Sequence, residues 1–160
     1  MQNILIIGAT SAIATAAARH WARQGATLFL VGRTAAKLQQ VADDLSARGA
    51  TVHTHLLDLT QLDQHAAMLE ACRTALGRID IALIAHGTLP DQQACERDAR
   101  LALQEFTNNG LSVIALGFAC DNTTTTPTPT PTPDMAVAPA DMAMLVPVIS
   151  TIAPAMGSTA

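Results

Sequence analysis

The stretch Asn3-Ile-Leu-Ile-Ile-Gly-Ala-Thr-Ser-Ala-Ile-Ala14 contains a short apolar run, a glycine and a series of very small residues. An alanine-rich segment that favours a helix follows at once, over residues 11–24. Small side chains at such a turn let backbone N–H groups approach a pyrophosphate, and the positive end of the next helix faces that anion. The stretch therefore predicts a dinucleotide-binding strand–turn–helix unit.

Apolar and amphipathic segments alternate along residues 2–116. A continuous apolar run predicts a strand at 4–7, and strands are also predicted at 27–31, 51–57 and 79–85. The segments between and after them predict helices at 11–24, 35–48, 62–76 and about 94–115. Because this alternation is typical of βαβ units, we expect an α/β fold with a Rossmann-like, doubly wound parallel sheet over residues 1–116.

The pattern changes after Gly117. Residues 123–133 are a threonine run followed by alternating Thr-Pro, which favours an extended, solvated chain, so we expect a linker over 117–134. Residues 135–160 are rich in Ala, Met and Pro. The apolar run 145–152 predicts either an edge strand or no strand, because Pro147 lies within it.

Composition excludes several classes of function. The 160 residues carry a net charge of −4 and a single lysine, Lys37, so no nucleic-acid surface is expected. The three cysteines include no CxxC pair, which indicates reduced thiols rather than a disulfide framework or a metal site. The N-terminus has neither a basic segment nor a long apolar span, so we expect a cytoplasmic protein without a membrane anchor.

The first candidate site is the turn itself. Gly8, Ala12 and Ala14 have the spacing Gly-x-x-x-Gly-x-Gly, with alanine in the second and third glycine positions. Each alanine adds a methyl group where close backbone approach is needed, which weakens the motif without abolishing it. The residues expected to bind the cofactor here are Gly8, Thr10, Ser11, Ala12, Ile13 and Ala14.

The second candidate site follows the second strand. Gly32 is followed by Arg33, whose guanidinium suits a 2′-phosphate, and by Thr34, which adds a hydroxyl. An acidic residue in this region would select NAD, so NADP is the favoured cofactor and NAD the less favoured one. The alternative for Arg33 is a solvated loop position.

Two more strand ends carry candidate residues. Asp58, followed by Leu59, ends the third strand, where a carboxylate can accept from the adenine amino group; a turn or helix-cap role is equally open. The sequence Ala85-His86-Gly87 ends the fourth strand, beside the expected nicotinamide ribose. His86 has the titration range of a general acid, but lining the cofactor cleft is the favoured role.

Together these stretches resemble the short-chain dehydrogenase/reductase family. The resemblance runs from Gly8 through Gly32-Arg33, Asp58 and Ala85-His86-Gly87 to Phe106-Thr-Asn-Asn-Gly-Leu-Ser112. It implies an oxidoreductase that transfers hydride between NADP(H) and a carbonyl or alcohol substrate. It also implies that Asn109 holds a water in the proton relay, and that the chain forms a homo-oligomer.

The chain departs from the family pattern at the reacting end. The family has a catalytic serine after a fifth strand, and the only similar stretch here is 148–153, where Thr151 or Ser150 would take that position. The family's Tyr-x-x-x-Lys pair should follow, but the sequence contains no tyrosine. The sheet is therefore expected to be incomplete on its C-terminal side, with residues 135–160 a remnant or substitute of the fifth strand.

Two hypotheses of different classes follow. The first is a family enzyme whose C-terminal half is lost, and which is catalytically incomplete as it stands. The second is a non-catalytic module that binds a nucleotide or a protein partner.

Overall fold

Four parallel strands form the centre of the molecule, and the computed structural model describes residues 1–121 around them. The strands are β1 (Asn3–Ile7), β2 (Thr27–Gly32), β3 (Thr51–Leu56) and β4 (Ile81–Ile84), in the order β3-β2-β1-β4. Ile4 of β1 pairs with Leu28 of β2 on one side and with Ile81 of β4 on the other. The predicted α/β fold with a parallel sheet is confirmed for the described residues.

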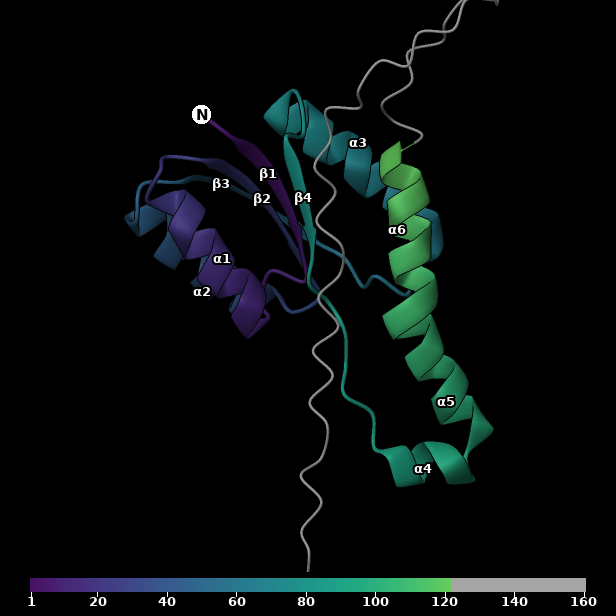
Figure 1. The fold of residues 1–160 in the computed structure, drawn as a ribbon. Helices are drawn as coiled ribbons and strands as arrows, with labels where there is room; N and C mark the ends of the chain where they lie inside the picture. The colour runs from purple at the N-terminus through teal and green to yellow at the C-terminus, as the bar shows by residue number, and fades with distance from the viewer. Residues whose placement is uncertain (122–160) are drawn as a thin grey trace, which may run out of the picture.

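Helices cover both faces of this sheet (Figure 1). On one face lie α1 (Ala12–Ala22) and α2 (Ala35–Ala47), and on the other lie α3 (His65–Leu76) and α6 (Ser112–Asp121). Successive strand residues point to opposite faces. Ile4 and Ile6 therefore enter the core under α1 and α2, while Leu5 and Ile7 enter the core under α3 and α6.

Capping residues set the boundaries of α1 and α3. Ser11 caps α1, because its Oγ accepts from the Ala14 N–H at 3.1 Å, so the helix begins one residue later than predicted. α3 is preceded by a 3₁₀ turn (Leu62–Gln64) and ends at Gly77, which has a φ of +76°. β3 and β4 end one residue earlier than predicted, and β4 begins at Ile81 rather than residue 79.

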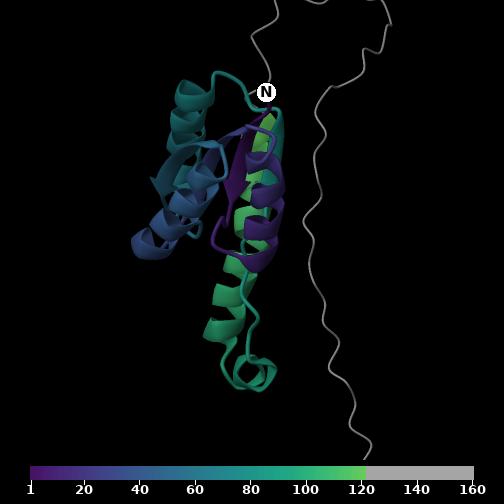
Figure 2. The same cartoon turned by 90° about the vertical axis from the view of Figure 1, so that its left-hand side faces the viewer.

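The single helix predicted over 94–115 is wrong. The structure has α4 (Gln92–Arg97), α5 (Ala99–Phe106), a π-helical turn (Thr107–Leu111, η2) and then α6. Asp98 breaks the run because its backbone is extended, with φ −131° and ψ 104°, and its carboxylate caps the N–H of Arg100 at 2.8 Å. Seen in two directions, α4 lies at the end of the molecule opposite the N-terminus (Figures 1 and 2).

α6 also continues to Asp121, so the domain boundary predicted after residue 116 falls inside this helix. Leu116, at this predicted boundary, is completely buried in the same core cluster as Met68 and Leu69 of α3. The predicted linker beyond Asp121 and the tail 135–160 lie outside the described residues.

Candidate functional site

The turn after β1 brings the backbone against the end of β4. Gly8 has a φ of +77°, which favours glycine, and a Cβ placed on it would lie 2.5 Å from the backbone nitrogen of His86. The N–H groups of Gly8 and Ala9 both donate to the Val31 carbonyl at 3.0 Å. The turn is thus fixed from both sides, by β2 through hydrogen bonds and by β4 through close contact.

A cavity of about 170 Å³ lies at the carboxyl ends of the strands, around this turn. Its volume is smaller than that typical of a pocket for a whole drug-sized ligand, so a dinucleotide that contacts its walls would extend beyond it. The lining residues are Gly8, Thr10, Ser11, Gly32, Arg33, Leu57, Asp58, Leu59, Ala85, His86, Gly87, Thr88 and Asn108. The structure therefore brings together the predicted residues from all four strand ends.

Five predicted site residues do not line this cavity: Ala12, Ile13, Ala14, Thr34 and Asn109. Ala14 is completely buried in the core, and its N–H is already bonded to Ser11. Ile13 is 49% exposed on the surface of α1. For Ile13 and Ala14, helical geometry explains the difference, because successive α1 side chains point to the surface or into the core and away from the strand ends. Ser150 and Thr151 lie outside the described residues.

On the β2 side, Arg33 and Asp58 both line the cavity. Asp58 Oδ1 accepts from the N–H of Thr60 at 3.0 Å and from its hydroxyl at 2.8 Å. These bonds, with a smaller contribution from the Arg33 charge, lower the pKa of Asp58 and keep its carboxylate ionised. Asp58 thus has the turn role that the sequence left open, while remaining at the cavity wall. Leu59 is 7% exposed and belongs mainly to the core.

On the β4 side, His86 forms a hydrogen-bonded chain with Ser112. The Ser112 hydroxyl donates to the Asn108 carbonyl at 2.7 Å, so it accepts from His86 Nε2 at 2.7 Å. His86 Nδ1 is buried and has no partner in the structure. Burial is the main cause that lowers the pKa of His86, so the ring is held neutral. A neutral ring leaves Nδ1 as an acceptor.

Asn109 holds the loop after β4 rather than pointing into the cavity. Its Oδ1 accepts from the Thr88 N–H at 2.8 Å, and its Nδ2 donates to the Thr88 carbonyl at 3.0 Å. A Cβ on Gly87 would lie 3.1 Å from this Oδ1, so the loop and the π-turn are in close contact. The side chain of Asn109 is therefore bonded to backbone, and the predicted water-holding role of this residue stays a prediction.

Sequence reasoning missed four lining residues as site residues: Gly32, Leu57, Thr88 and Asn108. Each lies next to a predicted one, and the rule that ligands bind outside the carboxyl ends of parallel strands would have included the first three. Asn108 has no such signal, because its placement depends on the π-turn.

The residues present fit a dinucleotide in chemical type. Gly8 leaves no room for a side chain between the turn and β4, Thr10 and Ser11 supply hydroxyl groups, and Arg33 supplies a cation. Within residues 1–121, no cluster of His, Cys, Asp or Glu side chains is placed to hold a metal ion. In the same residues, no helix is long and apolar enough to cross a membrane.

The short chain dehydrogenase family model matches residues 2–120, and the chain belongs to this family. It is 32% identical over 120 residues to an uncharacterized oxidoreductase of the mprA 5′ region of Streptomyces coelicolor, covering 74% of this chain and 47% of that protein. A short-chain type dehydrogenase/reductase from Mycobacterium marinum superposes with a TM-score of 0.70 at 28% identity, covering 76% of this chain and 49% of that one.

The fold is also shared with a putative dehydrogenase from Burkholderia cenocepacia that was solved with bound NADP. That structure has a TM-score of 0.66 and 24% identity, and it covers 72% of this chain and 45% of that one. The chain spans between about a quarter and half the length of the curated relatives it matches. Family membership therefore covers the part of the fold that the structure describes.

Proposed function

We propose that the chain binds NADP(H) and provides the cofactor-binding part of an oxidoreductase that acts on a carbonyl or alcohol substrate. The observation that supports this most is the turn at Gly8, which lies at the carboxyl ends of four parallel strands in one cavity with Arg33. When bound, the nicotinamide would give or take the hydride. This chain's residues would hold and orient it.

The residues that line the cavity are assigned to different parts of the dinucleotide according to the strand end on which they lie. The sheet order places the ends of β2 and β4 on opposite sides of β1. We assign Arg33 to the 2′-phosphate and Asp58 to the adenine on the β2 side. Thr10 and Ser11 would bind the pyrophosphate, and Gly87 with His86 would lie on the nicotinamide side. The preference for NADP over NAD rests on the guanidinium of Arg33, because a carboxylate is the group that suits an unphosphorylated ribose.

The reacting end is the open part of this proposal. Asn109 is assigned a positioning role, and the catalytic assignments of Ser150 and Thr151 remain predictions. Because the sequence contains no tyrosine, a second candidate function is a non-catalytic module that binds NADP(H) or a protein partner. For both candidate functions, we propose a homo-oligomeric state and a cytoplasmic location.

Thermal unfolding with NADPH and NADH in parallel tests the proposal. At one hundred times its dissociation constant, a ligand stabilises the folded state by about 2.7 kcal/mol. We expect a larger rise in melting temperature with NADPH than with NADH, and we expect Arg33→Gln to remove that difference. Arg97→Gln, on α4 and outside the cavity, is the matched control and should leave both shifts unchanged.

The outcomes separate the candidates. If neither nucleotide raises the melting temperature of a cooperatively folding chain, nucleotide binding is refuted. If NADPH binds, its oxidation with a panel of aldehydes and ketones distinguishes an enzyme from a binding module. Equal shifts with both nucleotides that survive Arg33→Gln would refute the NADP preference while leaving the site intact.

A further inference from the structure

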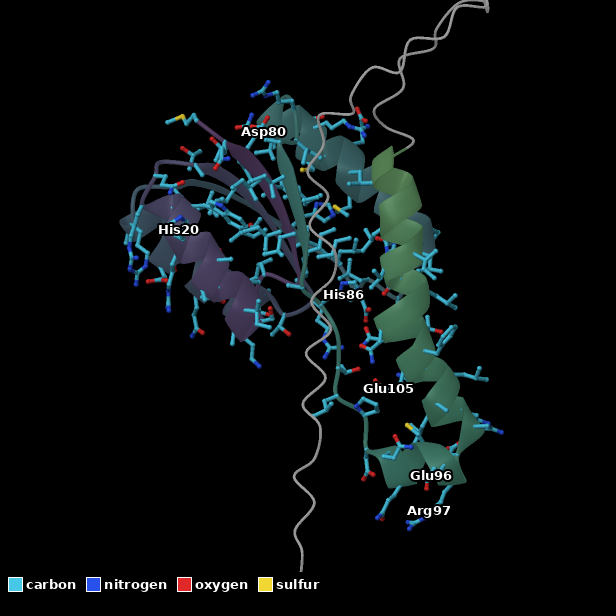
Figure 3. The ribbon with its side chains drawn as sticks, viewed as in Figure 1. His20, Asp80, His86, Glu96, Arg97 and Glu105 are labelled. Atoms are coloured by element: carbon cyan, nitrogen blue, oxygen red, sulfur yellow. The ribbon has the colours of Figure 1, made fainter. Side chains whose placement is uncertain are left out.

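A second set of hydrogen bonds lies behind the cavity wall on the β4 side. One carboxylate oxygen, Glu105 Oε2, accepts from the Thr88 hydroxyl and from Asn109 Nδ2, the latter at 3.3 Å. Thr88 Oγ1 in turn accepts from Asn108 Nδ2 at 2.8 Å. Glu105 is half-buried on α5, and it faces the loop that leaves β4 (Figure 3).

The direction of these bonds depends on Glu105. An ionised carboxylate only accepts hydrogen bonds, so the single hydroxyl proton of Thr88 is committed to it. The lone pairs of Thr88 Oγ1 are then available to the Asn108 amide. Without the carboxylate, the Thr88 hydroxyl would be free to rotate, and Asn109 Nδ2 would keep only its bond to the Thr88 carbonyl.

We propose that Glu105 is a positioning residue for the nicotinamide side of the site, and that it acts through Thr88 and Asn108. Both of these residues line the cavity, whereas Glu105 does not. The inference rests on the proposed function, because it assigns the wall that Glu105 orders to the NADP(H) site. Arg33, at the β2 end of the same cavity, lies outside this network.

Binding of two ligands to the wild type and a set of variants tests the proposal. NADPH reaches both sides of the site, whereas adenosine 2′,5′-bisphosphate has only the adenosine side. We compare the wild type with Glu105→Ala, Glu105→Gln and Glu96→Ala. Glu96 is the matched control, since its carboxylate lies on α4, bonds to Gln92 of the same helix at 3.1 Å, and lies far from His86 (Figure 3).

Glu105→Ala is expected to weaken NADPH binding about tenfold, which corresponds to the loss of about one net hydrogen bond. Binding of the bisphosphate should stay within about twofold. Glu105→Gln should bind both ligands within about twofold of the wild type, because a single amide oxygen can accept the two bonds that Oε2 accepts. Thr88→Val should reproduce the Glu105→Ala profile, since it removes the hydroxyl that links Glu105 to Asn108.

Hydrogen exchange supplies a readout that needs no ligand. The Thr88 N–H is bonded to Asn109 Oδ1, which Glu105 helps to hold. Glu105→Ala should speed exchange at Thr88 about tenfold, while Glu105→Gln and Glu96→Ala should not.

The proposal is overturned if Glu105→Ala leaves both NADPH affinity and Thr88 exchange unchanged. It is also overturned if Glu105→Ala weakens both ligands equally, because that indicates a general loss of stability. If the wild type binds no NADPH, the proposed function fails, and exchange at Thr88 then decides whether Glu105 orders the wall at all.

Discussion

The two sides of the cavity are built in different ways. The side-chain hydrogen bonds of the turn after β1 join residues three to six positions apart, as between Ser11 and Ala14. Those of the β4 side join residues up to 26 positions apart, as between His86 and Ser112. The first side is specified by a short stretch of sequence, and the second exists only when the helices after β4 are in place.

Substitution of Gly8 tests how far the turn depends on one residue, and it should give the largest effect. Gly8 and Gly77 have nearly the same φ, +77° and +76°, but a Cβ added at Gly8 would meet the backbone of β4's end at 2.5 Å, whereas one added at Gly77 would meet nothing within 4 Å. Gly77→Ala should cost about 1–3 kcal/mol for the backbone alone, because φ +76° with ψ −50° is a conformation that residues with a side chain rarely adopt. Gly8→Ala should cost about 1–3 kcal/mol more, because the turn must move away from β4.

Urea unfolding of both variants measures the two costs. Gly8→Ala should also lose any NADPH-induced rise in melting temperature, whereas Gly77→Ala should keep it. Equal losses of stability for the two variants would show that the contact between the turn and β4 relaxes without cost.

Ser112→Ala makes the corresponding test on the β4 side. Ser112 is completely buried, and its removal leaves His86 Nε2 without an acceptor and the Asn108 carbonyl without the hydroxyl donor. A buried polar group left unpaired costs about 1–3 kcal/mol. Denaturant unfolding should show that loss, and Ser46→Ala on the exposed face of α2 should stay within about 0.5 kcal/mol of the wild type. A loss no larger than that of the control would mean that His86 finds another partner.

The difference between the two sides of the cavity explains which features could be predicted from the sequence. The strands, the glycine of the turn and the residues at strand ends follow from local patterns, so Gly8, Arg33, Asp58 and His86 were found in one cavity. The break at Asp98 and the π-turn were not predicted, because a single aspartate cap and the Asn-Asn-Gly stretch are weak signals inside a long segment that favours helix.

The two neighbouring asparagines illustrate the same difference between local and distant contacts. Asn108 enters the cavity wall because the π-turn sets its direction, while Asn109 turns to the Thr88 backbone. Neighbouring asparagines in a sequence do not show which of them faces a ligand. Ala12 and Ala14 were included because they stand at glycine positions of the motif; Ala14 is buried in the core, and neither lines the cavity.

The smallest expected effect is the pH dependence that His86 adds to stability. Burial lowers the pKa of His86 in the folded state below its ordinary value of 6.5. The unfolded chain therefore takes up a proton more readily, so stability should fall as the pH drops through about 6.5 and level off below the folded pKa. His86→Gln retains a donor for Ser112 without a titrating group, and it should lack the component that is lost as the pH falls through about 6.5. Asp44, whose pKa is lowered to about 2 by its bonds to Arg48 and Arg19, titrates well below that pH. Parallel stability curves for the wild type and His86→Gln would show that burial does not hold this ring neutral, and that the β4 side gains no pH dependence from it.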